Sequence, residues 1–386
     1  MKVLVVGGNF DNNGGRASSI IDKFSNEICY YLMKIDPENK FTTLTAYNGG
    51  HFNEIEEILQ EVSKADIVFW WANVPNDMPK IRNVKEVNPK CMLVTSKRND
   101  NEKYSFGELV NRALGAKANL CLEFSKQGDG KFNMMLFDPL GNEWYNGTDI
   151  KDCTNTMMDR LMFLKDVTRQ GCKQASGDVN IPNEENFFNL IKENAEVFHK
   201  LINPAPGVTR FLGNSSFRCQ RGFPSFKDDK MVYVSRRNVD KRYIGPEAFV
   251  PTFLGLKNEV YYKGDYKPSV DTPIQLRLYE KLPNIRYMMH AHVYVEGAPF
   301  TKNMVPCGGL EEVSEVVDTI RDTYGDLNKD FYAINLIGHG SIVMGDEVEK
   351  LKNIHYIGRP IPEKQYIQNI LKENQDLDTE GEIYYE

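Results

Sequence analysis

The stretch IRYMMHAHVY, residues 285–294, decides the fold of the second half of the chain. Apolar and aromatic residues surround its two histidines, and turn-forming residues stand on both sides of it, which is the pattern of a β-strand. Side chains in a strand alternate between its two faces, so His290 and His292 are predicted to share one face. Two imidazoles on one face suit a divalent metal ion. The pair is equally compatible with a structural or solvent-facing role, because a single His-x-His motif is a weak signal.

Length and composition limit the protein to a few classes. At 386 residues the chain exceeds one ordinary domain, so we expect two. A formal net charge of −7 does not indicate that the protein binds a nucleic-acid polymer. It is compatible with a local basic pocket for a small anion. The seven cysteines lack the close spacing of a disulfide scaffold or a zinc ribbon, which favours reduced thiols. No segment has the pattern of a signal peptide or a membrane span, so we expect a cytoplasmic protein without a membrane partner.

The first half of the chain alternates between strand-like and helix-like segments. Strands are predicted at residues 3–6, 41–46, 66–72, 91–96 and 119–124, and helices at 16–33, 53–63 and 106–114. This alternation is typical of a parallel sheet covered by helices, so residues 1–177 are predicted to form a Rossmann-like α/β domain. Residues 132–137 and 143–145 are expected to end the sheet as a hairpin.

The role of this first domain is open. Its glycine-rich residues 9–15 lie between a strand and a helix, where they could seat the phosphate of a nucleotide or nucleotide-sugar. They match neither of the common phosphate-loop patterns, so a turn that only reverses the chain is the alternative. Residues 171–183 have the composition of a linker, and a second domain is predicted at residues 178–386.

Five short motifs follow one another in that second half. They are Gly213-Asn214-Ser215-Ser216-Phe217-Arg218, Ser235-Arg236, Lys267-Pro268-Ser269-Val270-Asp271, His290-Ala291-His292 and His339-Gly340. In this order they resemble the class II aldolase/adducin family, which includes fuculose-phosphate aldolase, ribulose-phosphate 4-epimerase and methylthioribulose-phosphate dehydratase. Five motifs in one order are far more specific than any single motif. The resemblance covers residues 213–340 and leaves the first half of the chain outside it.

The resemblance implies a class II aldolase-like αβα domain with a catalytic metal centre. His290, His292 and His339 would bind a divalent metal ion, zinc in the first place, and leave a position open for substrate oxygens. Asp271 stands where the family has its acid/base carboxylate. Its alternative role is to cap the helix that is predicted to start at Thr272.

The resemblance also implies residues that bind the substrate. Asn214, Ser235 and Ser269 would line the pocket for a substrate phosphate. Arg236 follows Ser235 where the family usually has glycine, and Arg237 comes next. Their guanidinium groups could bind a phosphate or a carboxylate. The alternative is a solvated basic face made of Arg236, Arg237, Lys241 and Arg242.

These features together predict a metal-dependent lyase of the aldolase type. Its substrate would be a small phosphorylated or carboxylated sugar, and its chemistry would pass through a metal-stabilised enediolate. A sugar-phosphate epimerase or dehydratase would use the same site, and a non-catalytic adducin-like scaffold is the alternative from another class. The resemblance further implies a homo-oligomer, a tetramer in most of the family.

Overall fold

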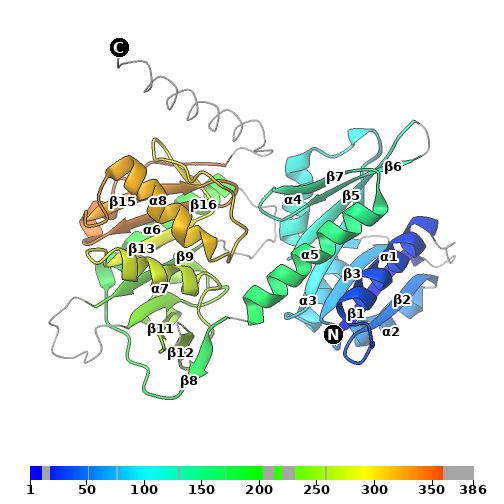
Figure 1. The fold of residues 1–386 in the computed structure, drawn as a ribbon, viewed down its shortest axis with the longest axis horizontal. Coiled ribbons are helices and arrows are strands. Elements are labelled where there is room, and N and C mark those ends of the chain that lie inside the picture. Colours follow the sequence, from blue (N-terminus) through cyan, green and yellow to red (C-terminus); the bar gives the residue numbers. More distant parts are fainter. Residues whose placement is uncertain are drawn as a thin grey trace, which may run out of the picture. The chain divides into compact units, whose positions relative to one another are not determined.

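The computed structural model describes residues 1–10, 18–50, 52–74, 77–128, 131–169, 171–202, 213–219, 231–256 and 259–359 (Figure 1). The chain divides into two compact units, the first containing Met1–Lys165 and the second beginning at Asp166. Among the described residues, no helix combines the length and the apolar character that a membrane crossing requires.

The first unit is built on a seven-stranded sheet with the order β2-β1-β3-β4-β5-β6-β7. Its first five strands pair in parallel, and β6 and β7 pair antiparallel at one edge. The predicted Rossmann-like sheet with its terminal hairpin is confirmed. The strands are β1 (Lys2–Phe10), β2 (Thr43–Gly50), β3 (Ile67–Asn73), β4 (Met92–Arg98), β5 (Leu120–Lys126), β6 (Phe132–Phe137) and β7 (Glu143–Gly147).

Helices cover both faces of this sheet. From Val3 to Val6 in β1, the side chains that point to one face and those that point to the other are all apolar, so both faces are buried. Val3 and Val5 pack in the cluster with α1 (Ser19–Ile35) and α5 (Ile150–Arg169). Leu4 and Val6 pack in the opposite cluster. That second cluster includes residues of α2 (Phe52–Val62), α3 (Asp77–Val87) and α4 (Phe106–Gly115). A strand buried on both faces appears in the sequence as a continuous apolar run.

Two details of the first unit differ from the sequence prediction or lie beyond it. α3 is absent from the predicted helices, because Pro79 and the charged residues around Ile81 and Val84 hide its apolar face in the sequence. Most of the glycine-rich segment 9–15 lies outside the described residues, so its role in binding a phosphate stays a prediction.

The second unit is built on an eight-stranded sheet with the order β15-β16-β13-β9-β10-β11-β12-β8. All neighbouring strands in it pair antiparallel except β12 and β8. The strands are β8 (Lys173–Ala175), β9 (Asn214–Arg218), β10 (Val232–Ser235), β11 (Phe249–Leu254), β12 (Val260–Lys263), β13 (Tyr287–Ala291), β15 (Phe331–Leu336) and β16 (Gly340–Gly345), and a separate pair joins β14 (Tyr294–Val295) to β17 (Tyr356–Ile357). The segment predicted as a linker, residues 171–183, thus contributes the edge strand β8 to this sheet.

Three helices complete an αβα sandwich around this sheet. α6 (Glu185–Ile202) packs Phe187 and Phe188 against one face. α7 (Thr272–Lys281) and α8 (Glu311–Tyr324) pack against the other face, through residues such as Leu278 and Ile320 (Figure 1). The predicted αβα architecture of the second half is confirmed. Short 3-10 helices occupy Asp100–Glu102 (η1), Lys241–Tyr243 (η2), Pro246–Ala248 (η3) and Val348–Leu351 (η4).

The strand that carries the histidine pair is shorter than predicted. β13 ends at Ala291, and His292 lies in a bend directly after it. Gly340, the first residue of β16, lies against the end of this strand, and its φ is +155°. A Cβ atom there would lie 2.0 Å from the Ala291 carbonyl oxygen and 2.8 Å from the His292 Cα atom. The two backbones therefore touch at this point, and only glycine permits the contact.

Replacing this glycine should destabilise the second unit. We expect Gly340→Ala to lower the free energy of unfolding by at least ~2 kcal/mol more than Gly325→Ala, because overpacking adds to backbone strain. Gly325 is the matched control, since its φ is +73° and the described residues leave open the space that a Cβ atom would fill there. Urea denaturation of both variants measures the difference. Equal losses would show that the close contact at Gly340 does not constrain the fold.

Candidate active site

Three histidines from distant parts of the sequence meet in the second unit. His290 is on β13, His292 follows its end, and His339 lies in the turn between β15 and β16. One ring nitrogen from each of the three lies within 4.8 Å of the others. The ring centroids are 4.6 Å apart for His290 and His339 and 5.0 Å apart for the other two pairs. The antiparallel pairing of β13 with β16 brings the turn beside the histidine pair.

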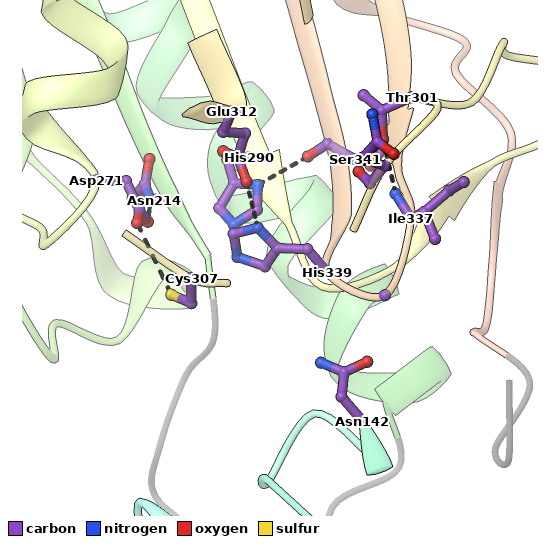
Figure 2. Close-up of polar contacts among 12 residues, drawn as sticks. Asn142, Asn214, Asp271, His290, Thr301, Cys307, Glu312, Ile337, His339 and Ser341 are labelled. Atoms are coloured by element: carbon purple, nitrogen blue, oxygen red, sulfur yellow. Dashed lines mark hydrogen bonds and ion pairs between the residues drawn. The ribbon is translucent and has the colours of Figure 1, made fainter. Parts of the chain in front are cut away.

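Two of the imidazoles are oriented by buried hydrogen-bond acceptors. The Nδ1 atom of His290 donates to the Ser341 carbonyl oxygen at 2.9 Å. The Nδ1 atom of His339 donates to the Glu312 carboxylate at 2.7 Å (Figure 2). The Nε2 atoms of both rings are buried and have no hydrogen-bond partner among the described residues. A buried polar atom without a partner is costly, so these nitrogens fit a site that holds a metal ion.

Burial and nearby charges set the protonation of these rings. Burial, together with the neighbouring His339, lowers the pKa of His290 to about 4, so its imidazole is neutral at pH 7 and ready to bind a metal. Burial by itself would lower the pKa of His339, but the Glu312 carboxylate and the Cys307 thiol raise it well above its ordinary value. A metal ion that binds His339 would therefore displace a proton from the ring. The Glu312 carboxylate would remain hydrogen-bonded to the Nδ1 atom and hold the ring in place.

Asp271 is the N-cap residue directly before α7, but its side chain makes no capping hydrogen bond. Instead one carboxylate oxygen accepts a hydrogen bond of 2.6 Å from the Asn214 amide. The other oxygen lies 3.9 Å from the Cys307 sulfur (Figure 2). The residue is only 8% exposed, and its charge acts on His290. The Asp271 side chain thus contacts Asn214 and Cys307, and it leaves the helix terminus without a side-chain cap.

The predicted substrate residues form one connected network around Asp271. Asn214 is the first residue of β9, and its amide oxygen accepts from Gln275. The Ser235 hydroxyl accepts from the Ser215 amide at 3.1 Å, and its carbonyl accepts from the Ser269 amide at 3.0 Å. The Asp271 amide donates to the Ser269 hydroxyl at 3.4 Å, so the structure brings Asn214, Ser235 and Ser269 together around Asp271.

The two arginines after Ser235 lie apart from this network. The Arg236 guanidinium stacks on the Tyr266 ring at 3.7 Å and donates to the Glu247 carbonyl oxygen. Arg237 lines a separate cavity with Lys267. Neither guanidinium is hydrogen-bonded to the three histidines or to Asp271.

Sequence patterns miss three residues of the site. Glu312 and Cys307 reach it from α8 and from the loop before that helix, and no motif includes them. Lys241, assigned in the sequence to a basic run, is only 8% exposed. Burial lowers the pKa of Lys241 to about 8, although the carboxylates of Asp240 and Asp271 favour its charged form. Lys241 is therefore a buried cation that the charge of the candidate acid/base carboxylate stabilises, and its ammonium donates to the Val239 carbonyl oxygen at 3.4 Å.

The comparison with known families agrees with this geometry. Residues 193–357 match the family model of the class II aldolase and adducin N-terminal domain. They therefore form a class II aldolase/adducin domain, and the resemblance predicted from the five motifs is confirmed. No curated protein matches the chain in sequence.

Solved structures with some similarity cover parts of the chain. An aldolase II superfamily protein from Pseudomonas syringae is 10% identical, with 50% of this chain and 86% of that one covered and a TM-score of 0.28. A DNA/pantothenate metabolism flavoprotein from Streptococcus pneumoniae is 11% identical, with 43% of this chain and 99% of that one covered and a TM-score of 0.33.

The buried lysine makes a prediction about pH. Below about pH 8, Lys241 is charged in both the folded and the unfolded protein, and burial of the charge destabilises the fold. Between that pH and the ordinary value of 10.5, the unfolded chain holds more protons, so the free energy of unfolding rises with pH. We expect Lys241→Met to remove this rise and to stabilise the protein at pH 7 by about 1–3 kcal/mol.

Urea denaturation of the metal-free protein at pH 7 and pH 10 measures this effect. Lys281→Met is the control, because Lys281 is exposed at the end of α7. The interpretation of Lys241 is wrong if both variants keep the pH dependence of the wild-type protein.

Proposed function

We propose that the second half of the chain is a divalent-metal-dependent lyase of the aldolase type, acting on a small phosphorylated or carboxylated sugar. The observation that carries the proposal is the convergence of three imidazoles beside the buried carboxylate of Asp271. A donor set of nitrogen atoms suits zinc, and three ligands leave a position for the substrate.

The histidines and their partners would prepare the site for the metal. His290, His292 and His339 would hold it, while the Ser341 carbonyl and the Glu312 carboxylate fix two of the rings from behind. When bound, the metal would polarise the substrate carbonyl and stabilise the negative charge of an enediolate.

Asp271 would move the proton. The Asn214 amide holds one of its oxygens, and Gln275 fixes that amide in turn, so the carboxylate has a set orientation. The second oxygen, on the side of Cys307, would take the proton from the substrate and return it. Asn214, Ser235 and Ser269 would lie around the anionic end of the substrate. Arg236 and Arg237 follow Ser235 directly in the chain.

Two alternatives share parts of this proposal. An epimerase or a dehydratase would use the same metal and the same carboxylate. An adducin-like scaffold would need neither, and the buried nitrogen atoms of His290 and His339 argue against it because they cost stability without a bound group. We also propose that the protein forms a symmetric homo-oligomer. The first domain would bind a nucleotide or a sugar.

The assignment of Asp271 is tested by its amide variant. We expect Asp271→Asn to lower kcat by about 10²–10⁴-fold without loss of bound metal, because the variant keeps the shape but cannot take a proton. The assay follows the release of a triose phosphate or glycolaldehyde phosphate from a panel of sugar phosphates. Asp265→Asn is the control, since Asp265 is exposed earlier on the same loop.

Each outcome separates the candidate functions. Full activity of Asp271→Asn would remove Asp271 from the mechanism. Turnover of a sugar phosphate without cleavage would favour the epimerase or the dehydratase. If the metal-loaded wild-type protein converts no member of the panel, the scaffold becomes the better account.

A further inference from the structure

Cys307 is a thiol of the second unit that the proposed function leaves without a role. It lies in a turn shortly before α8, in which the Gly309 amide donates to the Pro306 carbonyl oxygen at 2.8 Å. Gly308 follows it with a φ of +84°, and a Cβ atom there would lie 2.6 Å from the Val167 side chain. This hydrogen bond and this φ are those of a type II turn. The turn and its close packing therefore set the position of the Cys307 backbone.

The turn places the Cys307 sulfur at the candidate active site. The thiol donates to one carboxylate oxygen of Asp271 across 3.9 Å (Figure 2). The same thiol interacts with the His339 ring. Cys307 therefore has two neighbours from the site, one of them the candidate acid/base group and the other a predicted metal ligand.

Two imidazole nitrogens of this site lack a protein partner. The Nε2 atoms of His290 and His339 are buried, and neither has a hydrogen-bond partner among the described residues. His290 is 5% exposed and His339 is 1% exposed, so bulk water does not replace the missing partner. A metal ion suits both nitrogen atoms, and a sulfur atom that interacts with one of these rings lies close to the same ion.

We propose that Cys307 supplies a sulfur ligand to the metal ion of the three-histidine site. This inference rests on the metal-dependent function proposed above and adds a fourth protein ligand to it. A cysteine has one rotatable bond between its backbone and its sulfur. The sulfur can therefore turn from Asp271 to the metal while the backbone of the turn stays in place. The thiol would release its proton to the solvent when the bond to the metal forms.

A sulfur ligand would decide which metal the site takes. Thiolates favour zinc, whereas magnesium, calcium and manganese prefer oxygen ligands. Three imidazoles and one sulfur complete a tetrahedral set, and zinc also accepts a fifth ligand, so the site stays open to a substrate. The rotation would also free the Asp271 oxygen that the proposed mechanism uses to take a proton.

Cobalt(II) tests the ligand, because a bond between cobalt and a thiolate gives an intense absorption band in the near ultraviolet. We expect the metal-free, full-length protein to develop this band on titration with cobalt(II), together with the visible bands of bound cobalt. Cys307→Ser should lose the near-ultraviolet band and keep the visible bands. Cys172→Ser is the control and should keep both, since Cys172 is a partly buried thiol of the same unit that interacts with Thr272.

The same variant tests the choice of metal. We expect Cys307→Ser to weaken zinc binding at least about ten-fold, because the loss of a residue that only supports a metal ligand already weakens binding by about 10–100-fold. Manganese binding should change less, since manganese gains little from a sulfur ligand. Competition with a chelator measures both affinities. An equal loss for the two metals would contradict a role of Cys307 in metal selection.

X-ray absorption at the zinc edge tests the wild-type protein without any variant. One sulfur atom at about 2.3 Å from the zinc is expected. A zinc shell of nitrogen and oxygen alone, or bound cobalt without the near-ultraviolet band, would overturn the sulfur ligand and leave the three-histidine site intact. A band that persists in Cys307→Ser would assign the sulfur to another cysteine. If neither cobalt nor zinc binds at all, the proposed metal-dependent function is wrong as well.

Discussion

The candidate site depends on one close contact between two backbones. Gly340 lies against Ala291 and His292, with no room for a side chain between them. β13 ends at Ala291 beside this contact, and its antiparallel pairing with β16 brings the turn between β15 and β16 beside the histidine pair. An imidazole from residue 339 can therefore meet two imidazoles from residues about fifty positions earlier.

Buried polar groups surround the three imidazoles near that contact. The Glu312 carboxylate behind His339 and the Ser341 carbonyl behind His290 leave one nitrogen of each ring without a protein partner among the described residues. Asp271 adds a third buried group, held by Asn214 and turned away from the helix it could cap. Such a set costs stability in the absence of a ligand, which is typical of functional sites.

Local sequence patterns were sufficient to predict the architecture. They did not predict the contacts between residues that are far apart in the sequence. The alternation of Val3 and Leu4 between two cores reveals a doubly covered strand, and the five ordered motifs indicate the αβα domain. The segment that contains β8 was predicted as a linker. Its three residues of mixed polarity form a strand only because they pair with β12. Glu312 and Lys241 could not be predicted, since each owes its place to residues distant in the sequence.

The most direct test of the account is the metal content of the purified protein. After loading with zinc and dialysis, mass spectrometry should find about one zinc ion per chain in the wild-type protein and far less in His292→Ala. His355→Ala should keep the metal, because His355 is exposed and paired with Glu296. Equal zinc content in wild type and His292→Ala would contradict the central claim that the three imidazoles form a metal site.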